Sequence, residues 1–188
     1  MSDSRLTALE GLALVRLAAA AIEDRLAPRD AVAAVLRSVE LTSGLTGPRA
    51  IFVTLHATEG PGRVLRGCIG STEAVAPAHE AVLEAAIHAA FHDPRFAPLT
   101  TEEYGGIAVS VSALTPPRAV RADAIVAGED GVVLEHRAGR AVFLPEVAAE
   151  HGWSRDRILV QLCRKAGLPD LAWREAALFA FRSQHFGG

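Results

Sequence analysis

Strict alternation over residues 107–114 is the pattern that most limits the fold of this chain. Val109 and Val111 fall on one side of the segment, and Ser110 and Ser112 fall on the other. A side-chain period of two is the signature of a β-strand, so this segment is predicted to be one.

A hairpin is predicted upstream of this strand. Residues 50–56 alternate in the same way and are rich in β-branched and aromatic side chains. A turn rich in glycine and proline follows at residues 58–62, and residues 63–69 form the predicted return strand. Further strands are predicted at residues 132–136, 141–144 and 176–186.

Helices are predicted where apolar residues recur every three or four positions among many alanines. Residues 5–26 show this spacing, with Ser4 as the predicted N-cap and Pro28 as the stop. An alanine-rich helix is predicted at residues 77–91. Two shorter helices are predicted after Pro145 and at residues 155–166, the latter between an N-cap serine at 154 and a C-cap glycine at 167.

Composition excludes several classes of protein. Half of the 188 residues are hydrophobic, which supplies a sizeable core without disulfides or metals. The net charge is −3 with no block of like charge, which argues against general binding of nucleic acid. The two cysteines, Cys68 and Cys163, fit neither a zinc site nor a disulfide framework, and no signal peptide or membrane span is evident. A cytoplasmic location is therefore expected.

The least ordinary stretch is Leu65-Arg66-Gly67-Cys68-Ile69-Gly70, where a thiol stands between two glycines on a predicted strand. Alternation predicts that Arg66 and Cys68 share one face of this strand. Gly67 and Gly70 allow another group to approach the backbone closely. The stretch is therefore predicted to be either a binding site or a tight packing point.

Three further segments stand behind this motif in the order of a known family. They are Phe91-His92-Asp93-Pro94-Arg95-Phe96, Phe143-Leu144-Pro145-Glu146-Val147 with His151-Gly152-Trp153, and Leu162-Cys163-Arg164-Lys165-Ala166-Gly167-Leu168. With them the chain resembles the AMMECR family, also called protein A of the AmmeMemoRadiSam system. The resemblance covers nearly the whole chain.

The resemblance implies an α+β fold, with a mostly antiparallel sheet flanked by helices, in two unequal lobes of a single domain over residues 1–188. It also implies two partners, a Memo-like protein and a radical S-adenosylmethionine protein. Relatives often carry a glutamate at position 110, where this chain has Ser110, so no role for a carboxylate there is carried over.

The sequence allows two interpretations of Cys68. A nucleophilic or redox-active thiol needs a stabilised thiolate, and Arg66 and the N-terminus of the following helix are groups that lower a thiol pKa. Alternatively, Cys68 is a small buried residue, and Arg66 forms a salt bridge with a carboxylate of the helix predicted at residues 77–91. Arg66 with the backbone at Gly67 and Gly70 is also a candidate site for a small anionic ligand.

Two interpretations of Arg95 are open as well. In one, Arg95 joins Arg66 in a cationic pocket. In the other, the segment is structural, and Pro94 simply marks the place where the helix ends. Glu84, His88 and His92 share one helical face, as metal ligands do, but a solvated face is the preferred interpretation. No metal and no cofactor are indicated.

Two function hypotheses follow. The first is an accessory or binding component of a multi-protein modification system of the AmmeMemoRadiSam type, with its surface around Arg66, Gly67, Cys68, Gly70 and Arg95. The second is a cysteine-dependent enzyme that uses Cys68 as its nucleophile.

Overall fold

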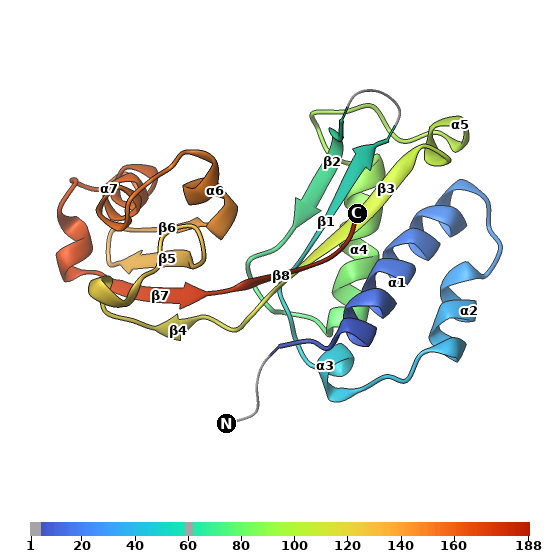
Figure 1. The fold of residues 1–188 in the computed structure, drawn as a ribbon, viewed down its shortest axis with the longest axis horizontal. Helices are drawn as coiled ribbons and strands as arrows, with labels where there is room; N and C mark the ends of the chain where they lie inside the picture. Colours follow the sequence, from blue (N-terminus) through green and yellow to red (C-terminus); the bar gives the residue numbers. More distant parts are fainter. Residues whose placement is uncertain (1–4, 59–61) are drawn as a thin grey trace. The chain divides into compact units, whose positions relative to one another are not determined.

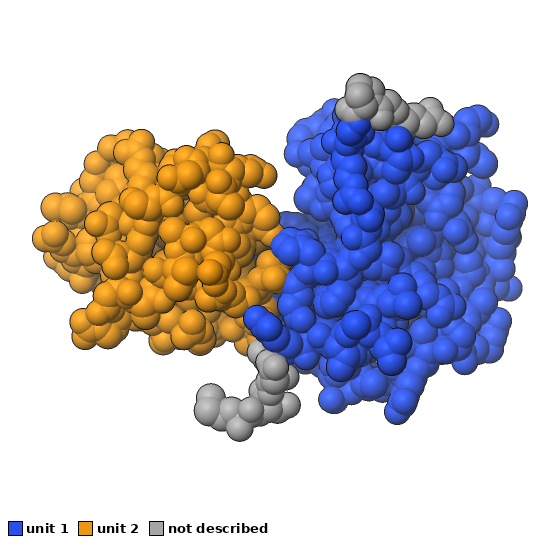
Figure 2. All heavy atoms as spheres, viewed as in Figure 1, with its two compact units in different colours: residues 1–114, 184–188 blue, residues 115–183 orange. Residues whose placement is uncertain are grey.

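The computed structural model describes residues 5–58 and 62–188. The chain divides into two compact units, unit 1 with residues 1–114 and 184–188 and unit 2 with residues 115–183, coloured separately in Figure 2. Each unit is built around one four-stranded sheet whose described strand pairs are antiparallel. The predicted α+β class is therefore confirmed.

Unit 1 carries two long helices. α1 (Ala8–Leu26) begins after Thr7, which forms a capping box with Glu10, whereas the predicted N-cap Ser4 lies outside the described residues. α4 (Ala78–Phe91) matches the predicted alanine-rich helix. The two helices pack on each other and on the sheet (Figure 1). The many alanines at their contacts let them approach closely. Shorter helices in unit 1 are α2 (Ala31–Ser38), α3 (Ser43–Thr46) and α5 (Thr101–Tyr104).

The sheet of unit 1 has the strand order β2-β1-β3-β8. Its strands are β1 (Ile51–Ala57), β2 (Val64–Gly70), β3 (Ile107–Leu114) and β8 (Ser183–Gly187). The predicted hairpin and the predicted strand 107–114 are confirmed, although residues 59–61 of the predicted turn lie outside the described residues.

The two faces of this sheet differ. The core face carries Ile51, Val53, Leu55, Val111 and Ala113, all buried against α1 and α4. We call the opposite face the outer face; it carries Phe52, Thr54, His56, Cys68, Ser110 and Ser112.

A β-bulge interrupts β2 at Arg66. His56 lies opposite Leu65, but Leu55 lies opposite Gly67, so Arg66 has no counterpart on β1. Beyond the bulge, Thr54 lies opposite Cys68. The prediction that Arg66 and Cys68 share one face assumed unbroken alternation of side chains along the strand. Because of the bulge, that assumption does not hold between these two residues.

Unit 2 is smaller, and its sheet has the order β4-β7-β5-β6. α7 (Arg155–Lys165) starts after Ser154, whose side chain accepts a hydrogen bond from the Arg157 N–H, as predicted. Gly167 follows it at a φ of 71°, a conformation that favours glycine. The other elements are β4 (Arg118–Ala119), β5 (Gly131–His136), β6 (Gly139–Phe143), β7 (Ala177–Phe181), α6 (Pro145–Glu150) and two 3₁₀ helices, Ala122–Ala124 and Ala172–Glu175.

The prediction of one terminal strand over residues 176–186 is wrong. The segment divides into β7, in the sheet of unit 2, and β8, in the sheet of unit 1. Arg182 stands between them and exchanges backbone and hydroxyl hydrogen bonds with Thr115. Its guanidinium pairs with buried Asp130 at 2.7 Å and with Glu129. These long-range contacts end β7, and no local pattern in the sequence reveals them.

A membrane-spanning helix is not found among the described residues, where every helix is too short or too polar to cross a bilayer.

Candidate functional site

Two of the sequence motifs, residues 65–70 and residues 91–96, meet at the edge of β2 that is turned away from β1. The Cys68 N–H donates to Asp93 Oδ2 at 2.9 Å, and Arg95 Nη2 donates to the Cys68 carbonyl at 3.2 Å. Arg95 also holds Asp93 through two hydrogen bonds, from Nε at 2.9 Å and from Nη2 at 2.7 Å. An edge strand ordinarily leaves such backbone groups unpaired. At Cys68, the Asp93 and Arg95 pair satisfies both of them.

Asp93 is the centre of this arrangement, and only 3% of it is exposed. The hydrogen bonds from the Arg95 guanidinium are the main cause that holds the pKa of the Asp93 carboxyl well below its usual range, and the Cys68 N–H adds to them against the effect of burial. Asp93 is therefore ionised, and it fixes the backbone of Cys68.

Arg66 points to a different set of partners. Its guanidinium pairs with Glu103 of α5 at 3.2 Å and donates to the Ala97 carbonyl at 2.9 Å. The side chain is 15% exposed, and it lines a cavity of about 300 Å³ beside α5. Hydrogen bonding by Arg66 is the main cause that lowers the pKa of Glu103. The alternative prediction that Arg66 forms a salt bridge is therefore confirmed, but its location is wrong: the carboxylate belongs to α5 and not to α4.

The aromatic ring of Phe96 brings the two arginines to one place. The Arg66 guanidinium lies 5.8 Å from the ring centroid and the Arg95 guanidinium 5.3 Å from it. Each guanidinium already has a carboxylate partner, Glu103 and Asp93 respectively. The two charges are therefore compensated within the chain.

The Cys68 thiol lies on the outer face of the sheet and is half-buried. Its sulfur accepts a hydrogen bond from the Thr54 hydroxyl at 3.3 Å. On the next strand, the Ser110 hydroxyl donates to the Thr54 carbonyl at 3.3 Å. His56 stands on the same face, two positions from Thr54 along β1. Thr54 of β1 is thus the polar neighbour of the thiol, and Ser110 of β3 lies one strand further along the same face.

The space beside the motif glycines is filled by the protein's own backbone. A Cβ atom at Gly67 would lie 2.2 Å from the Ala89 carbonyl oxygen of α4, and one at Gly70 would lie 2.2 Å from the Ile51 carbonyl oxygen. Both positions therefore need glycine for close packing. Of the predicted site residues, Arg95 and Cys68 are joined by a hydrogen bond, whereas Arg66 shares only the Phe96 ring with Arg95 and pairs with Glu103 of α5.

The sequence model of the AMMECR1 family matches residues 15–186, which include parts of both units. The chain belongs to the AMMECR1 family. Protein MJ0810 of Methanocaldococcus jannaschii is 40% identical over 190 residues, which cover 96% of this chain and 91% of the relative. Protein PF1979 of Pyrococcus furiosus is 37% identical, over 92% of this chain and 85% of the relative. The crystal structure of the uncharacterized protein PH0010 from Pyrococcus horikoshii is similar as well, with a TM-score of 0.74 and 32% identity over 97% of this chain and 93% of that chain.

Sequence reasoning missed three residues that shape the site of this AMMECR1-family protein. Thr54 was absent from the predicted site because the bulge at Arg66 decides which residue faces Cys68. Asp93 carries no predicted role of its own, and Glu103 lies outside every helix and strand predicted from the sequence. The Asp-Pro-Arg spacing was the available signal, since an acid and an arginine two residues apart can form a fork-shaped pair.

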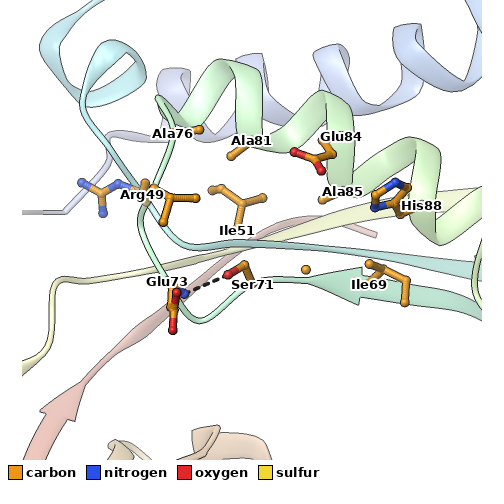
Figure 3. Close-up of a pocket in the computed structure, with 12 residues that line it drawn as sticks. Arg49, Ile51, Ile69, Ser71, Glu73, Ala76, Ala81, Glu84, Ala85 and His88 are labelled. Atoms are coloured by element: carbon orange, nitrogen blue, oxygen red, sulfur yellow. Dashed lines mark hydrogen bonds between the residues drawn. The ribbon is translucent and has the colours of Figure 1, made fainter.

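The last two residues of the motif, Ile69 and Gly70, line a separate cavity of about 280 Å³ between the sheet and α4. Figure 3 shows Glu84 and His88 of α4 at this cavity, above Ile69 and Ser71. The His88 ring meets the His92 ring edge-on, with 5.5 Å between centroids. No group of three metal-ligating side chains gathers anywhere in the described part of the chain.

Proposed function

We propose that this AMMECR1-family protein is a binding component of a multi-protein modification system of the AmmeMemoRadiSam type. Its outer face around Cys68 receives a segment of a partner protein or a small ligand. The observation that carries the proposal is the contrast between the fixed backbone of Cys68, held by Asp93 and Arg95, and the half-buried thiol on a polar sheet face.

The geometry favours the thiol side of the motif over its arginines. An anion at Arg66 would have to displace Glu103, and one at Arg95 would have to displace buried Asp93. The cost is largest at Asp93, which is buried, and displacement of the half-exposed Glu103 would leave the mostly buried Arg66 side chain without its carboxylate. Binding at the outer face requires no such displacement, because Thr54 and Ser110 have small side chains whose hydroxyls can donate or accept hydrogen bonds.

The family resemblance supplies the partners to test, a Memo-like protein and a radical S-adenosylmethionine protein. We expect Ser110→Arg, which places a long charged side chain on the outer face, to reduce their copurification with the chain at least tenfold. Ser43→Arg is the matched control, because Ser43 is exposed on α3, which packs with α4. Equal recovery with both variants counts against the proposal, as does loss of recovery with Ser43→Arg alone.

A cysteine-dependent enzyme is the second candidate, and the Thr54 hydroxyl favours it. This hydroxyl donates to the sulfur, the atom that a cysteine-dependent enzyme uses as its nucleophile. This candidate predicts that Cys68 reacts with iodoacetamide at neutral pH faster than a free thiol in a peptide. A Cys68→Ser variant that retains full activity in the assembled system rules the candidate out, whereas the binding proposal survives that result.

A further inference from the structure

We propose that unit 2 carries a second ligand site, for a small organic anion with an apolar, ring-sized body, such as an aryl phosphate. The site is an open cavity of about 440 Å³. Arg121, Arg155 and Arg174 surround it, and Trp173 forms part of its wall. None of its lining residues belongs to the outer face, so this site is independent of the proposed function.

The charges at this cavity are unevenly compensated. Arg121 pairs with Asp123 at 3.2 Å, and Arg155 pairs with Asp156 at 2.9 Å. Arg174 has no carboxylate partner among the described residues and lies over the Trp173 ring, 5.5 Å from its centroid. Three arginines thus face two aspartates, which leaves the cavity with an excess positive charge.

Two of the three arginines, Arg121 and Arg155, act on the same aspartate. Hydrogen bonding by Arg121 is the main cause that lowers the pKa of Asp123, and the charge of Arg155 contributes to it. Both guanidinium groups therefore act on one side of the cavity. Exposed pairs of this kind are weak, so an incoming phosphate can take over an arginine fork from an aspartate.

The base of the cavity is apolar. Leu178 is 7% exposed, and Val120, Ala176 and Trp173 pack against the core of unit 2 beside it. Aromatic side chains stack with flat ligands, and cavities of this size suit a ring with one substituent. A ring alone would leave the arginines unused, and a phosphate alone would leave the apolar base unused. The combination selects a ligand that has both.

The experiment uses phenyl phosphate as the probe, with inorganic phosphate and phenol as its two halves. The full chain has two tryptophans, so two indole N–H signals are expected in a ¹H–¹⁵N spectrum, and Trp153→Phe assigns them. Phenyl phosphate is expected to shift the Trp173 signal saturably and to leave the Trp153 signal in place. It should bind more tightly than phosphate or phenol.

Arg174→Ala is expected to weaken this binding about tenfold, the loss typical of one charge-assisted contact. Arg137→Ala is the matched control, because Arg137 is exposed in the turn between β5 and β6 and carries the same charge. The proposal is overturned if the two variants bind alike, if inorganic phosphate binds as tightly as phenyl phosphate, or if only the Trp153 signal moves. The unchanged remainder of each variant's spectrum reports that it folds.

Discussion

The two faces of the unit 1 sheet differ in burial and in polarity. On the core face, Val53, Leu55 and Val111 are fully buried against α1 and α4. On the outer face, Thr54 and Ser110 alternate with them and carry hydroxyls that reach neighbouring groups rather than a packed interior. The same strands therefore provide stability on one side and accessible chemistry on the other.

The motif takes part in both faces. Gly67 brings the backbone of β2 against α4, while the next residue, Cys68, presents its thiol on the outer face. Interiors are close-packed and tolerate little change of volume, whereas half-exposed polar positions tolerate more. Substitutions on the core side should therefore cost much more stability than substitutions on the outer side.

The largest expected difference is the accessibility of the two thiols. Cys163 is fully buried in the core of unit 2, and burial is the main cause that raises the pKa of its thiol. It reacts only when the structure opens locally, so we expect Cys68 to be alkylated about 1,000-fold faster at pH 8. Peptide mapping after timed iodoacetamide labelling measures both rates. Equal rates would place Cys68 in the core as well.

Gly67→Ala tests the core side of the motif. The added Cβ would meet the Ala89 carbonyl oxygen, which belongs to helix backbone and cannot move aside cheaply. We expect the free energy of unfolding in urea to fall by about 3 kcal/mol. Gly105→Ala is the control, because Gly105 has a helical φ of −59° and open space around it. A similar loss in both variants would mean that the contact with α4 is not the cause.

Asp93→Ala tests the pair of Asp93 and Arg95, which hydrogen-bonds the backbone of Cys68 at the edge of β2. It leaves the Cys68 N–H and the Arg95 guanidinium without their acceptor, and we expect a loss of about 2 kcal/mol. Asp123→Ala is the matched control, because Asp123 pairs with Arg121 at the same spacing but in solvent. It should change the stability little. If both variants behave alike, the Asp93 pair does not hold the edge.

The same carboxylate predicts a dependence on pH. Its pKa is lowered in the folded state from the ordinary value of 3.8. The stabilisation is therefore complete above about pH 4, and it is lost as the pH falls through the lower, folded value. The difference in unfolding free energy between the native chain and Asp93→Asn should shrink steadily below pH 4. A difference that stays constant down to pH 2 would contradict the assignment.

Local patterns were enough to predict several of the elements. The strand over residues 107–114 and the helix that Ser154 caps appear where alternation and capping predict them. Both signals are local, since each depends on residues within a few positions of one another.

What local patterns could not reveal is how distant residues meet. The bulge at Arg66 adds one residue to β2, and an added residue changes which side chain faces Cys68 without changing the composition of the strand. The contact of Asp93 with Cys68 spans 25 residues and depends on where α4 ends. The division of the last strand depends on Arg182 and Asp130, which also lie far apart in the sequence. These pairings determined the geometry of the candidate site.

The smallest expected effect comes from exchanging valine and threonine at neighbouring positions of β1. Thr54→Val keeps the shape of the side chain and removes the hydroxyl that donates to Cys68, so we expect a loss below about 0.5 kcal/mol. Val53→Thr makes the reciprocal change on the core face, where a hydroxyl is buried without a partner, and should cost about 1.5 kcal/mol. Urea unfolding of both variants measures the difference. If the two variants lose equal stability, the faces do not differ as their burial implies. A second measurement is the alkylation rate of Cys68: a reaction slower by about twofold in Thr54→Val would mean that the hydroxyl stabilises the thiolate.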